Sequence, residues 1–423
     1  MKIKEKISIE EFDGKKFKIK TFEAEDNKKA VVTHYLHNIH NGVKKHYEIE
    51  AKKYIKEIIE YKNFEENLSL VEESAIQQLL FEVEDVPFPT PENYSFKFID
   101  LFAGIGGFRI ALQNLGGKCV FTSEWDKYSQ ITYRANFGET PFGDITKESI
   151  KKYIPDEFDV LCGGFPCQPF SNAGLKKGFE DTRGTLFFDV VDILNRRIEI
   201  GKPVKVVFLE NVKGIKNHDK GNTLKTIIDT LDSLGYDVDT EILNSKNFGV
   251  PQNRERIFIV GWLKELDKTF NFPFGIDSED QIIYKKNNLI DSKSTLVGDI
   301  LIKNPETKYT ISDKLYAGHI RRRKEHKEKG NGFGFASVNK NSSYTSTISA
   351  RYYKDGSEIL VEQENNNPRK LTPREAANLQ GYPKNYKIPV SDNQAYKQFG
   401  NSVSVPVIQT IFNEIKTQLL QHI

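Results

Sequence analysis

The sequence predicts an α/β protein with a doubly wound, mainly parallel sheet, because short apolar runs alternate with helical and loop segments between residues 96 and 261. After that region the chain becomes polar and rich in Asn, Lys, Gly and Ser, which predicts a smaller, loop-rich domain. Before it, helical patterning and a different charge balance predict an appended, mostly helical extension. The predicted boundaries are 1–94 for the extension, 95–275 for the sheet domain, 276–390 for the second domain and its hinge, and 391–423 for a C-terminal return to the sheet domain.

Length and composition exclude several classes of protein. A chain of 423 residues is long enough for two cores, and 38% hydrophobic with 28% charged residues is typical of a globular protein. The formal net charge of +2 excludes a protein that coats a polyanion with its whole surface, but it is compatible with a local basic patch. No segment approaches the roughly 20 apolar residues that span a bilayer, and the N-terminus lacks the apolar core of a signal peptide. Three cysteines are too few for a disulfide framework, and no Cys/His spacing is typical of zinc, so we expect a cytoplasmic protein without a metal.

The N-terminal extension is acidic and contains no arginine. It holds 15 lysines against 19 acidic residues, and it ends in a segment, 86–91, where three prolines at alternate positions favour an extended connector. Within it, residues 46–64 predict an amphipathic helix whose apolar positions are Tyr47, Ile49, Ile55 and Ile58. We interpret the extension as a packing or accessory element, because its composition is unsuited to reading DNA bases.

Five apolar runs are predicted as strands of the sheet. The first meets a glycine cluster and is followed by a helix over residues 108–116, which ends at a glycine pair. The others are separated by lengths that suit helices or loops. The predicted strands cover 96–102, 118–123, 160–162, 204–209 and 257–261.

A nucleotide-like pocket is predicted where the first two strands end. Glycines 104, 106 and 107 let the backbone approach a ligand closely, and the following helix N-terminus offers free N–H donors. Glu124 ends the next strand and suits ribose hydroxyls, Trp125 suits an adenine ring, and Asp144 suits the adenine amino group. The glycine cluster alone is also consistent with a tight structural turn, and its spacing differs from that of dinucleotide-binding folds. With the two acids and the tryptophan, it favours an adenosine-bearing ligand other than NAD.

A nucleophilic site is predicted at the same edge of the sheet. Cys167 lies in a loop rich in Gly and Pro directly after a strand, whereas Cys119 and Cys162 fall inside apolar runs and read as core residues. Glu210 ends another strand, and an arginine pair, Arg254 and Arg256, precedes the last one. Singly, the acid could cap a helix and the arginines could form surface pairs. Together, a thiol, a carboxylate and two guanidiniums at strand ends predict nucleophilic catalysis.

The ordered motifs FxGxGG, EW, GDI, GFPCQ, ENV, QxRxR and GNSV resemble those of the DNA cytosine-5 methyltransferases of bacterial restriction–modification systems, over roughly residues 96–423. The resemblance implies a Rossmann-like domain that uses S-adenosylmethionine, a target-recognition domain, duplex DNA as substrate and no metal. It implies that Cys167 attacks carbon 6 of a flipped-out cytosine, that Glu210 holds ring N3, and that Arg256, beside Arg254, orients the base and favours the thiolate. The cofactor pocket that it implies is lined by Phe102, Ala103, Gly104, Ile105, Gly106, Gly107, Glu124, Trp125, Asp144, Ile145, Pro166, Leu186, Asn401 and Ser402.

A basic stretch lies where this family keeps its target-recognition domain. Residues 318–354 carry nine Lys or Arg residues against two acids, which favours contacts with phosphates, although such a charge run is also typical of a solvated surface. Arg351 is a candidate for bidentate contact with guanine, and the stretch resembles the recognition segment of methylases that act on CCNGG- or CCWGG-like sites. The predicted DNA-binding residues are Gln168, Ser171, Arg321, Arg322, Arg323, Thr347 and Arg351.

Two other functions remain open from the sequence. One is a tRNA cytosine-5 methyltransferase with the same chemistry, although the long basic insert favours duplex DNA. RNA methylases with two catalytic cysteines are disfavoured, because only Cys167 occupies a suitable loop. The other is a DNA-binding regulator with an inactive core, against which the complete set of catalytic residue types argues. A cognate restriction endonuclease is an expected partner in the same system, and a monomer is sufficient for one active site within one chain.

Overall fold

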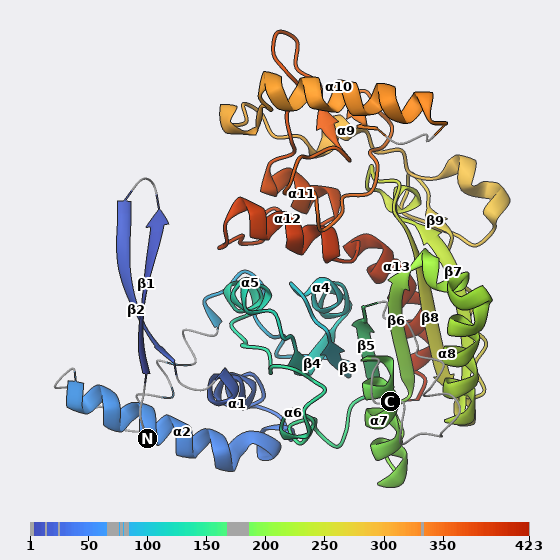
Figure 1. The fold of residues 1–423 in the computed structure, drawn as a ribbon. Coiled ribbons are helices and arrows are strands. Elements are labelled where there is room, and N and C mark those ends of the chain that lie inside the picture. Colours follow the sequence, from blue (N-terminus) through green and yellow to red (C-terminus); the bar gives the residue numbers. More distant parts are fainter. Residues whose placement is uncertain are drawn as a thin grey trace.

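The structure is a computed structural model, and it describes residues 4–12, 15–23, 26–65, 76, 79, 84–166, 186–330 and 334–422. A six-stranded sheet lies at its centre, with helices on both faces and a second lobe beyond the carboxyl ends of the central strands (Figure 1). This arrangement confirms the predicted α/β class.

The central sheet has the order β4-β3-β5-β6-β8-β7. The first four strands in this order are parallel, and β8 runs antiparallel to both of its neighbours, so the sheet is mainly parallel as predicted. All five predicted strands are present. The sixth, β7, was not predicted, because acidic residues at alternate positions leave its edge half exposed and without an apolar run. The strands are β3 (Phe96–Leu101), β4 (Gly117–Ser123), β5 (Val160–Gly164), β6 (Val206–Val212), β7 (Tyr236–Asn244) and β8 (Glu255–Leu263).

Alternating side chains of the strands feed two hydrophobic clusters, one on each face of the sheet. Val206 and Phe208 of β6 enter one cluster, and Val207 and Leu209 enter the other, as the period of two requires. The first face is covered by α4 (Gly107–Asn114), α5 (Lys127–Phe137) and α13 (Val405–Leu419). The second is covered by α7 (Leu186–Glu199) and α8 (Asn222–Ser233), with the short α6 (Glu148–Lys151) near one edge.

The second lobe is loop-rich, as expected, and it shares its core with one face of the sheet. Ile348 and Tyr352 of this lobe belong to the same buried cluster as Phe96 and Phe98 of β3. After the lobe, α13 returns and packs against α4, which places the last segment on the sheet. The exact domain boundaries remain predictions. The elements of the lobe are β9 (Gly275–Ile276), β10 (Ile282–Ile283), α9 (Val297–Ile300), α10 (Asp313–Glu328), β11 (Ser337–Val338), β12 (Leu360–Val361) and α11 (Pro373–Leu379), and α12 (Asp392–Asn401) begins the C-terminal return.

The N-terminal extension consists of an antiparallel hairpin, β1 (Lys4–Phe12) and β2 (Lys15–Glu23), followed by α1 (Asp26–His37) and α2 (Lys44–Glu65). The two helices confirm the helical prediction, whereas the hairpin was not anticipated.

The predicted apolar face of α2 needs one correction. Tyr47 and Ile55 are buried as expected, but Ile49 is 86% exposed. Residues four apart share a helix face, and Ile49 lies two positions from Tyr47, on the opposite side. The side chain of Ile58 lies outside the described residues. The buried face is therefore built by Tyr47, Ala51 and Ile55.

Neither a membrane span nor a metal cluster is found in the described part of the chain. None of its helices combines the length and the apolar character needed to cross a bilayer. The same residues contain no group of three or more His, Cys, Asp or Glu side chains that could hold a metal ion.

Candidate active site

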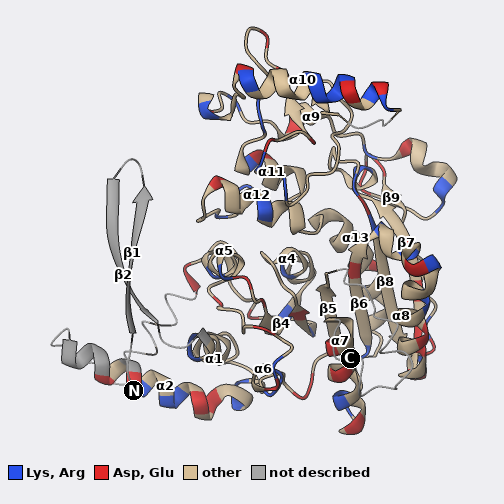
Figure 2. Ribbon diagram, in the orientation of Figure 1, with Lys and Arg blue, Asp and Glu red and all other residues tan. Residues whose placement is uncertain are grey.

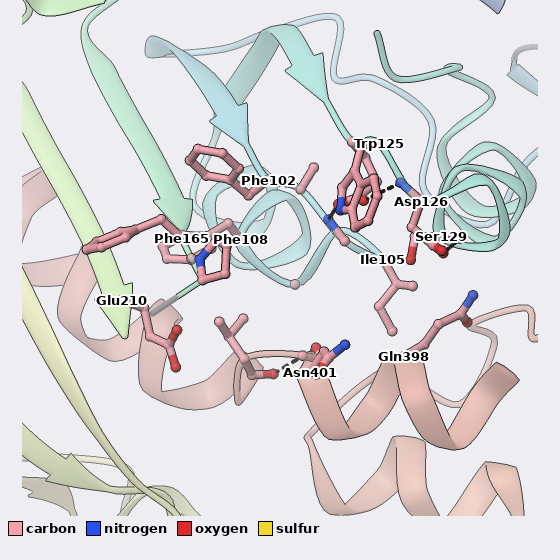
Figure 3. A pocket seen from close by; sticks show the side chains of 18 of the residues that line it. Phe102, Ile105, Phe108, Trp125, Asp126, Ser129, Phe165, Glu210, Gln398 and Asn401 are labelled. Carbon is pink, nitrogen blue, oxygen red and sulfur yellow. Dashed lines mark hydrogen bonds between the residues drawn. The ribbon is translucent and has the colours of Figure 1, made fainter. Parts of the chain in front are cut away.

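A cavity of about 810 Å³ opens where the parallel strands end, between the sheet and α12. Glu210 lies at one end of this cavity, and Trp125 and Gln398 lie toward the other (Figure 3). The lining combines residues from the first strands with the C-terminal return, as predicted. Of the residues predicted to bind the cofactor, those that line the cavity are Phe102, Ala103, Gly104, Ile105, Gly107, Glu124, Trp125, Asp144, Ile145, Pro166, Leu186, Asn401 and Ser402.

Gly106 is the predicted cofactor residue that does not line the cavity, and the backbone explains why a glycine is needed there. Its φ is +81°, and a Cβ atom would come within 2.3 Å of the ring of Phe137. A Cβ on Gly107 would meet Val403 at 2.6 Å and the hydroxyl of Tyr382 at 2.9 Å. The glycines therefore let α4 approach both α5 and the C-terminal return, which closes the cavity.

Glu124 connects the end of β4 to the glycine turn. Its Oε2 accepts from the Gly104 N–H at 2.7 Å, and its Oε1 accepts from the Asp126 N–H at 2.7 Å. Burial raises the pKa of Glu124, against the effect of these backbone donors. Each carboxylate oxygen has a second lone pair for a ligand hydroxyl. Beside it, Trp125 is 77% exposed, so its indole face is accessible to a stacking partner.

Two polar side chains of the cavity wall, Asp144 and Gln398, offer groups for a polar ligand. Asp144 accepts from the N–H and the hydroxyl of Thr146, which fixes its carboxylate at the rim. Gln398, from α12, accepts from the Thr132 hydroxyl through Oε1, while its buried Nε2 has no hydrogen-bond partner among the described residues. A buried donor without a partner beside a cavity is suited to a polar ligand. Sequence reasoning missed Gln398, because it lies more than 250 residues from the strands that it faces.

The end of the cavity with the predicted catalytic residues is formed by Glu210 on β6 and Arg256 on β8. The two residues lie on neighbouring strands, and Arg256 Nε lies 3.1 Å from Glu210 Oε1. Burial raises the pKa of Glu210, although Arg256 and Arg254 oppose this effect. The strand beside it carries Gly164, where a Cβ atom would come within 3.2 Å of Glu210 Oε2. The carboxyl therefore points across a glycine into the space next to β5.

Arg254 lines the same cavity, and its two terminal nitrogens donate to three backbone carbonyls, whereas its buried Nε has no hydrogen-bond partner among the described residues. Its guanidinium donates to Ile348 O at 3.2 Å, to Gly400 O at 3.3 Å and to Ser402 O at 2.6 Å. Burial lowers the pKa of Arg254 to about 9, so the group is still charged at neutral pH. Arg254 thus ties the start of β8 to both the second lobe and the C-terminal return.

The loop that carries the predicted nucleophile is held at its start by Asn211. The Asn211 side chain donates to Phe165 O at 2.8 Å and accepts from the Val212 N–H at 2.8 Å. Phe165 and Pro166 directly precede the nucleophile in the chain. Cys167, Gln168 and Ser171 themselves lie outside the described residues.

The two remaining cysteines are both fully buried. Burial raises the pKa of each thiol, which keeps the thiolate from forming. Their interpretation as core residues is confirmed.

The predicted DNA-binding residues fall into separate groups. Thr347 donates to Asn253 O at 2.7 Å and lines a second cavity of about 320 Å³ next to the first, together with Arg256. Arg351 is exposed on a turn of the second lobe. Arg321, Arg322 and Arg323 lie on α10, at the far end of this lobe, where basic and acidic residues are interspersed (Figure 2).

The arginines of α10 differ in their surroundings. Arg322 is engaged by Asp355 Oδ2 at 3.0 Å and by His319 Nδ1 at 2.9 Å, which links the helix to the turn that follows Arg351. Arg323 lies over the ring of Phe335, and Arg321 is 3.7 Å from Glu325 at an exposed position. Arg322 is therefore the least available of the three for a phosphate.

Comparisons with known proteins agree with the resemblance of the motifs. The model of the family described as C-5 cytosine-specific DNA methylase matches residues 96–417. Type II methyltransferase M.NlaX of Neisseria lactamica is 54% identical over 327 residues, which cover 77% of this chain and 97% of that protein. Type II methyltransferase M.HpaII of Haemophilus parainfluenzae is 49% identical over 370 residues, which cover 83% and 97%.

Solved structures support the fold alone. The Entamoeba histolytica methyltransferase EhMeth has a TM-score of 0.57 at 20% identity, over 77% of this chain and 98% of that one. The Dnmt2 methyltransferase of S. pombe also has a TM-score of 0.57, at 18% identity, over 75% and 96%. With the family match over most of its length, the chain belongs to the C-5 cytosine-specific DNA methylases, enzymes that use S-adenosylmethionine.

Proposed function

We propose that this enzyme methylates carbon 5 of a cytosine extruded from duplex DNA, through a transient bond between Cys167 and carbon 6 of the base. The observation that carries the proposal is the Glu210–Arg256 pair, which faces the same cavity as the glycine turn and Trp125. The loop that leads to Cys167 begins beside this pair, at Phe165 and Pro166. One cavity can therefore hold a base at one end and an adenosine at the other.

The residues of the catalytic end suit each step of the reaction. Carbon 5 of cytosine is a poor nucleophile, so the Cys167 thiolate first adds to carbon 6 and pushes electrons into the ring. Glu210, whose raised pKa favours the protonated form, donates its proton toward ring N3 as negative charge develops there. Arg256 fixes the Glu210 carboxyl and offers its remaining donors to the base carbonyl.

The second half of the reaction restores the enzyme. S-adenosylmethionine supplies the electrophilic methyl group. Carbon 5 takes that methyl group and loses its proton to a base, the bond between carbon 6 and sulfur breaks to release the Cys167 thiolate, and ring N3 returns its proton to Glu210. Arg254 acts in this scheme as a positioning residue, because its donors hold the two loops on either side of the base pocket.

The base reaches the cavity from the side of the second lobe. The smaller cavity shares Val212 and Arg256 with the larger one and is lined by Lys213, Ser346 and Thr347. Hydroxyl and ammonium donors there suit the phosphates that flank an extruded nucleotide, and extrusion itself costs on the order of a few kcal/mol. The exposed Arg351 extends this surface toward neighbouring bases.

We further propose a restriction–modification role with a cognate endonuclease and a CCNGG- or CCWGG-like target. Support comes from the motif resemblance and from relatives that are named Type II methyltransferases. Bisulfite sequencing of DNA from an expressing host tests the target. Modified cytosines confined to GGCC or GCGC would contradict it.

The covalent mechanism is tested with duplex oligonucleotides that carry 5-fluorocytosine at the target position. The wild-type enzyme with S-adenosylmethionine should form a stable adduct through residue 167, and Cys167→Ser should form none while it still binds cofactor and DNA. Labelled cofactor offered with either duplex DNA or tRNA separates the proposal from the RNA alternative. Transfer to tRNA alone would refute the proposed substrate.

A further inference from the structure

Strand β4 is an edge strand of the sheet, and side chains of the N-terminal helices satisfy its outward backbone groups. The Tyr47 hydroxyl of α2 donates to Val120 O at 2.8 Å. The Thr122 N–H donates to His34 Nε2 of α1 at 3.2 Å. His34 Nδ1 lies 2.8 Å from Ala30 O, an acceptor, so Nδ1 carries the proton and Nε2 is free to accept. The two helices thus stand where a neighbouring strand would lie (Figure 1).

The same edge continues into the cofactor end of the cavity. From Thr122 onward, the segment 139–146 pairs with this edge through the backbone. The Phe142 N–H donates to Thr122 O at 2.9 Å, and the Glu124 N–H donates to Phe142 O at 2.8 Å. The extension contacts this segment too, because the Thr140 N–H donates to the Thr33 hydroxyl at 3.1 Å. The segment carries Asp144 and Ile145, which line the cavity.

Ring packing joins the extension to this segment. The Phe142 ring lies 4.6 Å from the His34 ring and 5.1 Å from the Phe121 ring, between centroids. Phe142 is fully buried, so a change in α1 or α2 shifts the residue that hydrogen-bonds to both Thr122 and Glu124.

We propose that helices α1 and α2 act as a side-chain cap on the β4 edge and thereby set the affinity of the enzyme for S-adenosylmethionine, by positioning Glu124 and Asp144. This role belongs to a segment outside residues 96–417, the part that matches the family model. It rests on the assignment of these two acids to the cofactor pocket.

Full-length variants with single atoms or groups removed test the proposal. Tyr47→Phe deletes the hydroxyl that donates to Val120 O and also lies 3.1 Å from Tyr153 O, with the ring unchanged. His34→Phe deletes the acceptor for the Thr122 N–H and keeps an aromatic ring, although a larger one. Binding of S-adenosylmethionine is measured by calorimetry without DNA, and the KM for the cofactor is measured separately from kcat. Because a typical hydrogen bond contributes on the order of 1 kcal/mol, we expect affinity to fall about three- to tenfold, with kcat and DNA affinity within about twofold of wild type.

Two matched variants serve as controls. Tyr54→Phe removes a hydroxyl from the same helix α2, where the ring of Tyr54 lies near Lys28 instead of near β4, and cofactor affinity should not change. His34→Gln returns a side-chain acceptor close to the position of Nε2 and should recover part of the lost affinity. If His34→Phe does not fold, Thr33→Val removes the acceptor for the Thr140 N–H, together with a hydroxyl that donates to carbonyls of its own helix. This variant should lower the affinity for the cofactor by a smaller factor.

Hydrogen exchange gives a local readout in the same variants. Exchange at residues 139–146 should rise in Tyr47→Phe and fall again with saturating cofactor. Variants that unfold more readily but bind S-adenosylmethionine as tightly as wild type would overturn the proposal and leave the extension a stabilising element only. If instead the wild type binds cofactor but methylates no DNA, the proposed function fails and the cap remains supported.

Discussion

The Glu210–Arg256 pair and the Glu139–Arg109 pair each join a buried carboxyl group to an arginine, and the pKa values of the two carboxyls are shifted in opposite directions. Glu210 borders the cavity beside Arg256, and burial raises its pKa in spite of the neighbouring guanidiniums. Glu139 is sealed beside α1, with Arg109 Nη1 at 2.7 Å. Burial also favours its neutral form, but Arg109, His34 and His37 together outweigh this effect and lower the pKa of Glu139. A carboxyl whose pKa is raised takes up a proton more readily, which suits proton transfer, whereas a carboxyl whose pKa is lowered stays ionised and suits a structural ion pair.

The largest loss of stability is expected from breaking the Arg109–Glu139 pair, the sealed cluster. Arg109→Met removes the guanidinium from Glu139 and from the Tyr133 hydroxyl, and it leaves a buried carboxylate without its partner. The free energy of unfolding should fall by about 3–5 kcal/mol, as for other broken buried pairs. Urea denaturation measures it. The double variant with Glu139→Gln should recover part of the loss, and a cost below about 1 kcal/mol for Arg109→Met would contradict the structural role.

The corresponding change in the Glu210–Arg256 pair, the open cluster, should lower the rate of methyl transfer and leave stability nearly unchanged. Glu210→Gln cannot deliver a proton to ring N3, so single-turnover methyl transfer should slow about 100-fold or more, while cofactor affinity stays within about twofold. In the wild type, the protonated form is lost as pH rises through the raised pKa of Glu210, so the transfer rate should fall on the alkaline side. The variant should lack that decline, and an unchanged rate would remove the proposed role of Glu210.

Arg254 combines features of both clusters, because it lines the cavity yet binds only backbone carbonyls among the described residues. Arg254→Met leaves the carbonyls of Ile348, Gly400 and Ser402 without their donor, which should cost about 1–3 kcal/mol of stability. Thermal denaturation checks this effect. If Arg254→Met keeps its stability but loses methyl transfer, Arg254 acts on the base directly and is not a positioning residue.

His37 lies beside the sealed cluster and makes it sensitive to acid. Burial lowers the pKa of His37 to about 3, and neither ring nitrogen has a hydrogen-bond partner among the described residues. The unfolded chain takes up this proton near pH 6.5, so the contribution of neutral His37 is complete above about pH 6.5 and is lost as pH falls toward 3. One such group gives a slope of up to about 1.4 kcal/mol per pH unit. Urea denaturation between pH 7 and 5 should show a shallower slope for His37→Leu, and an identical slope would contradict the assignment.

The open cluster was predictable from the sequence, and the sealed one was not. Glu210 directly follows one predicted strand and Arg256 directly precedes another, in motifs that the family resemblance groups at one site; the two strand ends meet because β8 runs antiparallel to β6. Arg109, Glu139 and His34 come from three separate helices and loops, and no local pattern signals that they meet. The hairpin β1–β2 was missed although Phe17 and Ile19 alternate with lysines, a pattern typical of a strand, and β7 was missed because acidic residues alternate along it and leave no apolar run.

The arginines of α10 should have the smallest effects and the clearest dependence on salt. Arg321 is exposed, so Arg321→Ala should lower the affinity for all DNA sequences alike, by a few-fold at about 0.1 M salt. It should also reduce the slope of log affinity against log salt by about one. Arg322 is already engaged by Asp355 and His319, so Arg322→Ala should change the salt slope less and instead cost up to about 1 kcal/mol of stability. Filter binding over a salt series measures both variants. A guanidinium that stays paired with its own carboxylate releases no counterion from DNA. If the two variants reduce the salt slope equally, Arg322 therefore leaves Asp355 and binds a phosphate when DNA is bound.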